Sequence, residues 1–559
     1  MHRPHSPKAA PSAASPPVPV PAAPDGTGQR RRAVLNAALA AGAATALTAA
    51  GCGATGEPGK GSPSADGPGK SPGPTPARPA SPGPTPARPD WPALGRSLDG
   101  LFVRPGDSAY ASARQLYNTR FDALKPAAVA YVRHEDDVRE CLAFARSARV
   151  PVAIRSGGHS YAGWSSGNGK LVIDVSAIAR VDANGTIGAG AKLIDVYRGL
   201  AGHGRTVPGG SCPTVGISGL TLGGGHGVTS RAYGLTCDNL ISATLVTADG
   251  STLTADADRN PDLFWALRGA GNGNFGVVTE LRFRTRPAPP AVSGFLAYPW
   301  SRAQAVIGAW QEWGPEQPDE IWSSAHLDAG PGGGTPTVSV AVFSLGTYGD
   351  LQNAVDRLAE KIGASASSVS LRPHSFLETM LLYAGCSGLT DAQCHLPGPT
   401  PGRDEGGALQ REAYAAASDF FDRPLSGAGL RALIDRAEAF TRIPVDQGGG
   451  EGSIALTALG GAVNRVDPQA TAFVHRRSRV LAQYIGAWQS GTSGAAQQDW
   501  LKTTHAAMRR YASGAAYQNY VDPDLADWRK AYYGPSADRL ARLKERYDPA
   551  RLFTFPQSF

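Results

Sequence analysis

The sequence predicts an α+β protein whose two domains follow an extended N-terminal region. Residues 127–176 have the pattern strand, helix, strand, turn, strand, which is typical of an α/β unit. After about Pro287 the pattern changes to strands and long amphipathic helices. The chain from about Trp91 to Phe559 is longer than one ordinary domain and holds enough apolar residues for a large core or two smaller ones.

Local periodicity predicts the individual elements. In the first domain we expect strands at 128–132, 152–155, 171–175 and 243–247, and helices at 135–146 and 193–201. A glycine-rich span from Gly209 to Gly227 separates these elements. In the second domain we expect helices at 351–362 and 429–440.

Residues 1–52 have the features of an export signal. Arg31 and Arg32 precede an apolar, Ala-rich stretch that runs to Ala50. The arginine pair resembles a twin-arginine signal, a route for proteins that fold before export, as a cofactor-loaded enzyme requires. Residues 49–52 (AAGC) resemble a lipobox without its typical leucine, so lipidation of Cys52 stays open. A membrane-spanning anchor is the other interpretation, but the stretch is shorter than the roughly 20 apolar residues that a spanning helix needs.

We therefore expect an exported protein that is extracellular or, if Cys52 is lipidated, anchored to the outer face of the cell membrane through that lipid alone. Residues 53–90 are almost wholly Pro, Gly, Ser, Ala and Thr, which predicts a semi-stiff tether without a core. The net charge of +7 does not indicate a nucleic-acid partner, because no Lys/Arg-rich run with interleaved aromatic residues is present.

The cysteines indicate neither a metal site nor a disulfide scaffold. Six are few for such a scaffold, and no CxxC pair with metal-ligand spacing occurs. Cys386 and Cys394 lie close together in a Gly-rich segment, and an extracytoplasmic location would allow them to pair. We expect Cys141 to be buried in a helix.

Two glycine-rich segments hold the candidate chemistry. Residues 155–161 (RSGGHSY) follow directly on a strand, so their backbone N–H groups can face a phosphate. Residues 209–219 (GGSCPTVGISG) lead into 223–227 (GGGHG), and glycines this dense let a backbone lie flat against a planar or anionic ligand. Neither segment fits the spacing of a nicotinamide fold or a P-loop. Taken alone, His159 is more typical of a structural histidine, and Cys212 is more typical of a buried structural thiol.

The two segments, in this order, resemble the FAD-binding domain of berberine bridge enzyme-like oxidases, in the vanillyl-alcohol oxidase superfamily. Residues 233–239 (YGLTCDN), 246–250 (VTADG) and 262–279 match the same domain in order, and the match covers most of the chain after the tether. The resemblance implies a two-subdomain PCMH-type FAD-binding domain and a substrate domain with an antiparallel sheet covered by helices. We place them at 91–288 and 289–500, and expect residues 501–559 to return to the FAD domain.

In that family the histidine of the first segment bonds to the flavin 8α-methyl group and the cysteine of the second bonds to flavin C6. The resemblance therefore implies that FAD is attached covalently through His159 and Cys212. Two covalent links hold the flavin ring without a lid of protein over it and tend to raise its reduction potential. Further cofactor contacts are implied for Arg155, Ser156, Gly157, Gly158, Ser160, Tyr161, Val215, Gly216, Gly219, Gly224, Gly225, Gly227, Asp238, Gly276, Val278 and Asn519.

Residues 517–522 (YQNYVD) resemble the family's Tyr-x-Asn-Tyr segment, in which the second tyrosine is the usual base. This implies Tyr520 as the base, with Tyr517 as a second catalytic candidate. A tyrosine has a pKa near 10, so a base role requires a partner that stabilises the phenolate, and the sequence does not identify it. We interpret His475 as structural and leave His226 unassigned.

One strand departs from the family pattern. The family often places an acid, Gln or Lys on the strand before a Gly-Gly pair, whereas residues 453–461 (SIALTALGG) offer only Ser453 and Thr457 as polar residues. This departure weakens a direct transfer of mechanism or substrate.

Val215 stands three residues after Cys212, where the family associates valine with oxygen access, so the resemblance favours an oxidase. It implies that Tyr520 removes a hydroxyl proton while hydride passes to flavin N5, and that O2 then reoxidises the flavin to give H2O2. The substrate is expected to be a saccharide or a secondary metabolite with an alcohol or phenol. The alternatives are a dehydrogenase with another acceptor, and a surface lipoprotein that binds a ligand without catalysis.

Overall fold

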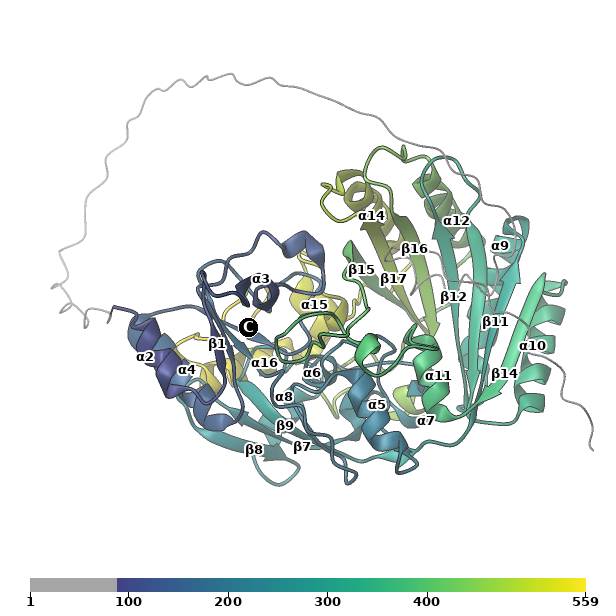
Figure 1. Ribbon diagram of the computed structural model, residues 1–559. Coiled ribbons are helices and arrows are strands. Elements are labelled where there is room, and N and C mark those ends of the chain that lie inside the picture. Colours follow the sequence, from purple (N-terminus) through teal and green to yellow (C-terminus); the bar gives the residue numbers. More distant parts are fainter. Residues whose placement is uncertain (1–87) are drawn as a thin grey trace, which may run out of the picture.

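The computed structural model describes residues 88–559, so the predicted export signal and most of the predicted tether lie outside the described residues. Two bodies stand side by side (Figure 1), one built on two small sheets and the other on one large sheet. Within residues 88–559, no helix has the length and apolar character needed to cross a membrane.

The first small sheet is the predicted α/β unit. Its strands are β1 (Leu101–Val103), β2 (Ala128–Tyr131), β3 (Val152–Arg155) and β4 (Leu171–Asp174), in the order β1-β2-β4-β3. Strands β2, β4 and β3 are parallel, β1 pairs antiparallel with β2 at one edge, and helix α4 (Glu135–Ala148) links β2 to β3. Every residue of β2 and β4 is buried, as parallel strands covered on both faces require. Cys141 is buried in α4, as predicted.

The second small sheet is antiparallel and has the order β5-β9-β7-β8. Its strands are β5 (Thr186–Gly188), β7 (Leu240–Val246), β8 (Thr252–Asp256) and β9 (Val277–Phe283), while β6 (Arg205–Thr206) and β10 (Arg286–Pro287) form a separate short pair. The helices of this body are α2 (Trp91–Ser97), α3 (Tyr110–Ala113), α5 (Leu193–Ala201), α6 (Ile217–Leu222), α7 (Ser230–Tyr233) and α8 (Pro261–Leu267). One apolar core joins the two sheets.

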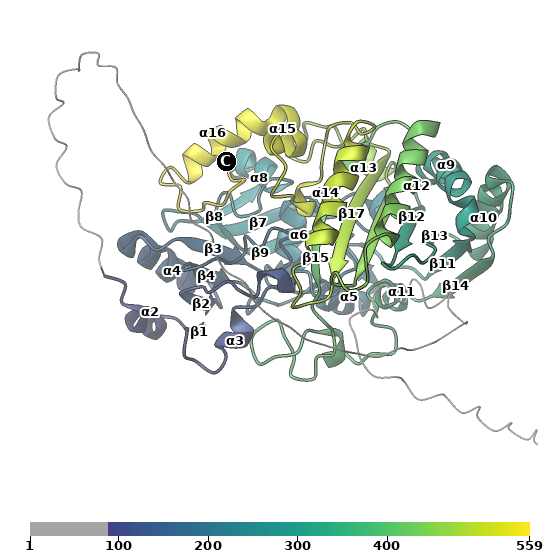
Figure 2. The same cartoon turned by 90° about the horizontal axis from the view of Figure 1, so that it is seen from above.

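The C-terminal helices return to this first body. Helix α16 (Ala537–Tyr547) lies beside α8 (Figure 2), and α15 (Trp528–Tyr533) packs against α16. Leu540 and Leu543 of α16 enter the shared core, whereas Asp538, Arg542, Glu545 and Arg546 are exposed, which gives the helix a strongly amphipathic character. Lys544 is the exception, because it is buried and donates a 2.7 Å hydrogen bond to Asp548. The first body is thus completed by residues from both ends of the described chain.

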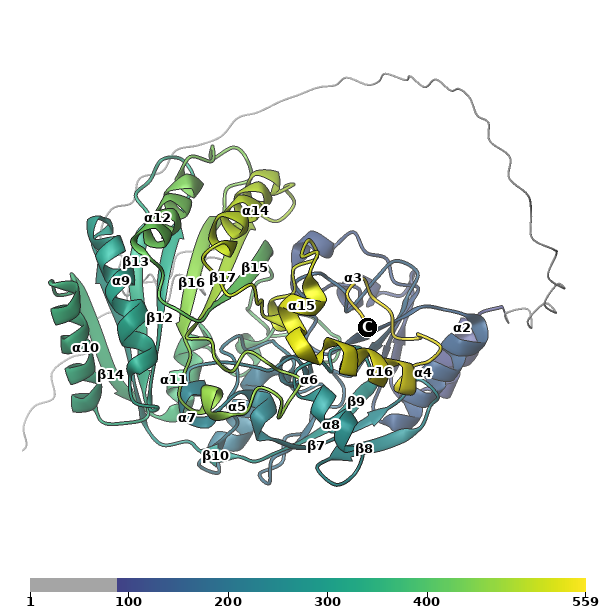
Figure 3. The ribbon, with the colours of Figure 1, turned by 180° about the vertical axis from the view of Figure 1, so that it is seen from behind.

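The large sheet has seven antiparallel strands in the order β14-β11-β13-β12-β16-β17-β15. They are β11 (Ala291–Tyr298), β12 (Ile321–Ala329), β13 (Thr337–Ser344), β14 (Ser368–His374), β15 (Ala413–Phe421), β16 (Glu451–Ala458) and β17 (Val480–Trp488). One face is covered by α9 (Ala303–Trp313), α10 (Tyr348–Ile362), α12 (Gly427–Thr441) and α14 (Ala495–Arg509) (Figure 3). Helices α11 (Phe376–Tyr383) and α13 (Ala462–Arg465) complete this body.

Strict alternation along β12 gives the large sheet two different faces. Ile321, Ala325, Leu327 and Ala329 pack in the core beneath the helices. The even-numbered residues of the strand point the other way, toward a cavity between the two bodies. The sheet is therefore both a core layer and one wall of that cavity.

The structure also refines two sequence-based expectations. Cys386 and Cys394 form a disulfide, with their Cα atoms 5.7 Å apart. The domain boundary that we placed at residue 500 falls inside α14, whose Trp500 and Leu501 pack in the core of the large sheet. The chain leaves that sheet only after this helix.

His505 of α14 ties the large sheet to the C-terminal segment. Its ring nitrogens lie 3.5 Å from a carboxylate oxygen of Asp419 on β15 and 3.5 Å from one of Asp522. Burial alone would lower the pKa of His505, but the two carboxylates outweigh burial and raise it to about 9. At neutral pH the ring is therefore a cation held between two anions.

This pair of contacts predicts a pH-dependent stability. The pKa in the folded chain, about 9, lies above the ordinary value near 6.5, so the stabilisation is complete below about pH 6.5 and is lost as the pH rises through 9. The raised pKa of His505 contributes at most about 3 kcal/mol to the free energy of unfolding. We expect H505Q to lower Tm at pH 6 and to match the unsubstituted protein at pH 10.

Thermal melts at several pH values check this expectation. H203Q, at an exposed histidine on a turn, is the matched control and should leave Tm unchanged throughout. A Tm difference for H505Q that stays constant from pH 6 to pH 10 would contradict the ionic role of the ring.

Candidate active site

A cavity of about 580 Å³ lies between the two bodies. Its walls come from the 156–161 turn, the glycine-rich 210–228 segment, the free face of the large sheet and the C-terminal residues 517–521 and 553–557. The size falls within the range of small-molecule and cofactor sites. A second cavity, lined by Gln311 and Phe421 among others, has only about 10 Å³. The large cavity, which holds both glycine-rich segments, is therefore the candidate site.

The two glycine-rich turns touch through their backbones. A Cβ on Gly157 would collide with the backbone nitrogen of Gly216, and a Cβ on Gly216 would collide with the side chain of Ser156. Glycine at both positions is therefore what allows the turns to approach this closely. The contact places His159 beside Thr214, with 2.9 Å between His159 Nε2 and the Thr214 hydroxyl oxygen.

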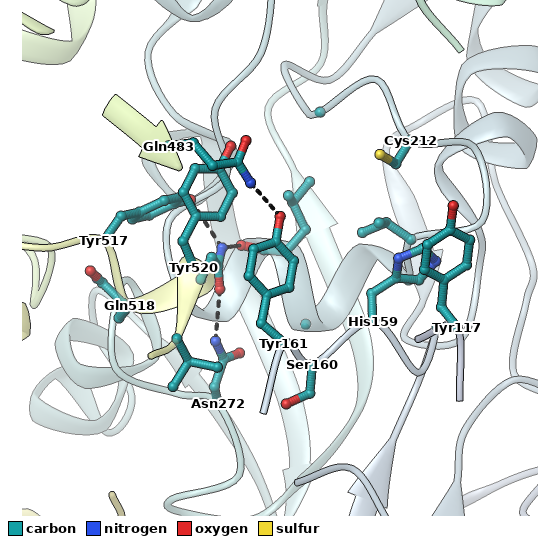
Figure 4. Close-up of a pocket in the computed structure, with 18 of the residues that line it drawn as sticks. Tyr117, His159, Ser160, Tyr161, Cys212, Asn272, Gln483, Tyr517, Gln518 and Tyr520 are labelled. Atoms are coloured by element: carbon teal, nitrogen blue, oxygen red, sulfur yellow. Dashed lines mark hydrogen bonds between the residues drawn. The ribbon is translucent and has the colours of Figure 1, made fainter. Parts of the chain in front are cut away.

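His159 and Cys212 both face the cavity (Figure 4). The His159 ring stacks on Tyr117, with ring centroids 4.1 Å apart and planes 18° from parallel. The Cys212 thiol is free and exposed, so the alternative of a buried structural thiol is wrong for this residue. It fits Cys237 instead, which is buried and whose thiol pKa is raised well above its usual value by burial.

Tyr520 lies in the short 3-10 helix η6 (Gln518–Tyr520) and also lines the cavity. Its hydroxyl oxygen is 2.7 Å from His226 Nε2. Its ring stacks on Tyr161, with centroids 5.4 Å apart and planes within 4° of parallel, and Gln483 donates a 2.7 Å hydrogen bond to the Tyr161 hydroxyl (Figure 4). Burial raises the pKa of Tyr520 well above its usual value, so the phenol is protonated at neutral pH.

Tyr517 and Asn519 hold the C-terminal segment against the glycine-rich run. The Tyr517 hydroxyl accepts hydrogen bonds from the Gly225 backbone N–H (2.8 Å) and from Asn519 Nδ2 (3.0 Å). Asn519 Nδ2 also donates to the Leu220 carbonyl (2.9 Å), and its Oδ1 accepts from Asn272 Nδ2 (2.9 Å). The Tyr517 oxygen is thus engaged with a backbone N–H group and a side-chain amide, which favours a positioning role over the catalytic role that the resemblance implied for it.

The structure gathers most of the predicted site residues at this cavity. Those that line it are Ser156, Gly157, Gly158, His159, Ser160, Tyr161, Cys212, Val215, Gly216, Gly219, Gly227, Tyr517, Asn519 and Tyr520. The others, which we also expected to contact the cofactor, lie behind its walls: Arg155, Gly224, Gly225, Asp238, Gly276 and Val278.

Their positions have physical reasons. Arg155 is paired with Asp174 on the neighbouring parallel strand, and Asp238 forms a buried ion pair with Arg476 (2.6 Å). Val278 is part of the first core. The three glycines serve close packing of the chain on itself: a Cβ would strike Thr236 from Gly225, Phe473 from Gly224 and the Val246 carbonyl from Gly276.

The residues at the cavity fit a flavin dinucleotide. Gly219 leaves open space where a Cβ would stand, and the exposed Cys212 lies on the same segment. Five lining residues carry buried polar atoms with no hydrogen-bond partner among the described residues, namely Ser165 Oγ, His226 Nδ1, Trp322 Nε1, Gln518 Oε1 and Gln557 Oε1. Buried polar atoms of this kind are satisfied when a polar ligand is bound.

Comparison with known proteins decides the family. Residues 126–256 match the FAD binding domain family, and residues 516–559 match the "Berberine and berberine like" family. Over 472 residues the chain is 30% identical to the uncharacterized FAD-linked oxidoreductase YgaK of Bacillus subtilis, covering 82% of this chain and 97% of that protein. The chain belongs to the berberine bridge enzyme-like family of FAD-linked oxidoreductases.

Two solved structures show the shared fold of the family. BBE-like 1 of Physcomitrella patens has 29% identity and a TM-score of 0.74, with 84% of this chain and 98% of that one covered. Xylooligosaccharide oxidase from Myceliophthora thermophila, in complex with xylobiose, has 28% identity and a TM-score of 0.73 over the same shares. The predicted α+β fold with a PCMH-type FAD-binding domain is confirmed, and this berberine bridge enzyme-like protein is an FAD-linked oxidoreductase.

Several residues at the site were missed by sequence reasoning. On the large sheet we looked for polar groups on β16 alone, but neighbouring strands supply more: Ser324, His326 and Asp328 from β12 and Gln483 from β17. Alternation along β12 (IWSSAHLDA) would have separated its polar face from its core face. His475 lies outside the cavity wall, with Nε2 3.0 Å from the Tyr532 carbonyl oxygen, consistent with its structural interpretation.

The backbone contact between the two turns yields a prediction. In G216A the new methyl group collides with Ser156 and Gly157, so we expect a loss of about 1–3 kcal/mol of stability together with most of the bound flavin. Denaturant unfolding and flavin absorbance of the purified protein measure both. The matched variant is G219A on the same segment, whose methyl group meets no protein atom and should leave the unfolding free energy unchanged or slightly raised. Equal stability of G216A and G219A would refute the contact.

Proposed function

We propose that this protein is an oxidase that carries FAD covalently through His159 and Cys212, oxidises a hydroxyl group of a saccharide or secondary metabolite, and reduces O2 to H2O2. One observation carries the proposal: the two attachment candidates, from turns packed against each other, line the same cavity as Tyr520. The family to which the chain belongs supports the flavin chemistry.

When bound, FAD supplies the acceptor for a hydride from the substrate and the donor of two electrons to O2. The chain's own residues bind the substrate, orient it and move its hydroxyl proton. Tyr520 takes that proton as the adjacent carbon loses hydride, which converts the alcohol to a carbonyl or lactone. Stacking on Tyr161 and the segment held by Asn519 fix the position of the Tyr520 ring, and such positioning supplies much of the rate.

The wall opposite the glycine-rich run suits a polyhydroxylated ring. Ser324, His326, Asp328, Ser453 and Gln483 present hydrogen-bonding groups there, beside the aromatic rings of Trp322, Tyr383 and Tyr414. Aromatic faces pack against sugar rings while polar groups bond their hydroxyls. The xylooligosaccharide oxidase that was solved with xylobiose supports a saccharide as the first choice of substrate.

Two further features support an exported oxidase. Val215 lines the cavity three residues after Cys212, the position that the family associates with oxygen access. The Cys386–Cys394 disulfide suits a protein that works outside the reducing cytosol. We therefore propose export through the twin-arginine signal, with attachment to the outer face of the membrane if Cys52 is lipidated.

The covalent links are tested by single substitutions. We expect H159A and C212A each to keep one link, so that denatured protein stays yellow, and the double variant to release all its flavin. T214V removes the hydroxyl that holds His159 Nε2, so we expect it to lower the histidyl-linked fraction several-fold while leaving the Cys212 link intact. Peptide mass spectrometry distinguishes the two links. Full flavin release by either single variant would contradict attachment at two residues.

The oxidase activity is tested by a peroxide assay across oligosaccharides, simple sugars, aromatic alcohols and polycyclic phenols. We expect one H2O2 per substrate oxidised, with the highest kcat/KM among saccharides. V215L should slow reoxidation by air at least tenfold while reduction by substrate keeps its rate. Slow reoxidation of the unsubstituted enzyme would instead favour a dehydrogenase with a quinone or protein acceptor.

A further inference from the structure

The hydrogen bond between His226 and Tyr520 joins two parts of the chain that are 294 residues apart. His226 stands in the GGGHG run, and Tyr520 stands in η6. The rings meet edge to face, with centroids 5.6 Å apart. The Gly225 N–H donates to the Tyr517 hydroxyl and the Gly227 N–H donates to Ser230, so the backbone on both sides of His226 is fixed.

The surroundings of the pair set its protonation. Burial raises the pKa of Tyr520. Tyr517 of the same segment and Tyr161 and Cys212 from two other segments raise it further. Burial lowers the pKa of His226 to about 4. At neutral pH the pair is therefore a neutral phenol bonded to a neutral imidazole, and the phenol still holds the proton that it must lose in order to accept another.

We propose that His226 is the proton acceptor through which Tyr520 acts as a base, an inference that rests on the proposed function. As the Tyr520 oxygen takes the substrate's hydroxyl proton, its own O–H bond breaks and an N–H bond forms at His226 Nε2. The substrate loses hydride from the adjacent carbon, its two electrons pass to the acceptor of the proposed function, and a carbonyl product remains. Among the described residues, His226 is the one side chain that bonds the Tyr520 hydroxyl.

The relay makes a distinctive pH profile. Its resting state needs an unprotonated His226, so kcat/KM should lie on a plateau from about pH 5 to pH 9 and fall in acid near pH 4. A Tyr520 that ionises on its own, with a pKa raised well above the usual value, would give activity that keeps rising beyond pH 9. The profile of the unsubstituted holoenzyme therefore tests the proposal before any variant is made.

Variants separate the relay from a structural role. H226N keeps a polar side chain, but an amide does not accept a proton near neutral pH. We therefore expect kcat to fall about 10²–10⁴-fold while KM changes little. The residual activity should rise with pH. H203N, at an exposed histidine away from the cavity, is the matched control and should keep both kcat and the profile. Flavin absorbance at the level of the unsubstituted protein shows that H226N has folded and loaded.

A readout without turnover completes the test. In holoenzyme labelled with ¹³C at the tyrosine ring, Y520F assigns the Tyr520 signal, and H226N should change both its shift and its titration. If Y520F is inactive but H226N keeps its kcat and an unchanged dependence of kcat/KM on pH, the role of His226 is overturned. The proposed function would still stand. Fully active Y520F would instead overturn Tyr520 as the base, and with it the proposed function.

Discussion

The site depends on the contact between the glycines at 157 and 216. Because neither residue has a Cβ, the turn after β3 and the loop before α6 meet backbone to backbone. His159 and Cys212 therefore line one cavity, and the buried Thr214 lies beside His159. The same device recurs at Gly223, where a Cβ would collide with the Asn519 side chain. Glycines thus let three distant segments of the sequence pack around a space large enough for a cofactor.

Burial is the second constraint, and it acts on both partners of the Tyr520–His226 pair. Removing water disfavours a charge on either group, so the phenol keeps its proton and the imidazole stays neutral. His505, by contrast, is charged because two carboxylates compensate for its burial. The C-terminal segment is therefore held to the large sheet by the ion pair between Asp522 and His505. Its Tyr520 forms a neutral hydrogen-bonded pair with His226 at the cavity.

Much of the fold could be predicted from local pattern. The limits of β3 and α5 agree with prediction to the residue, because each has a clear period and a turn signal at both ends. Strand β7 begins three residues before its predicted start, since the short 3-10 turn that precedes it ends at Asn239 without a glycine or proline to mark the change. The boundary at residue 500 was misplaced because α14 has no break there.

A site residue could be predicted only where a single sequence motif indicates both the place of the residue in the fold and its chemical role. His159 and Cys212 stand inside such motifs, but so do Arg155 and Asp238, whose side chains turn away from the cavity into ion pairs that no single motif reveals. The partner of Tyr520 could not be found because the bond to His226 is a product of tertiary packing. Periodicity assigns faces within one strand, but it does not say which strands lie side by side.

The cleft wall carries one more consequence for substrate choice. Its polar groups already bond one another: Ser453 donates to Asp328 (2.6 Å), Ser324 pairs with His326 (2.8 Å) and Gln483 donates to Tyr161 (2.7 Å). A ligand that displaces any of these bonds has to replace it, because each buried polar group left unpaired costs about 1–3 kcal/mol. Sugar hydroxyls both donate and accept hydrogen bonds, so they can replace the bonds of the wall groups with equivalent ones. An aromatic alcohol with one hydroxyl would leave most of those groups without a partner. The balance of hydrogen bonds therefore favours a saccharide in this cleft.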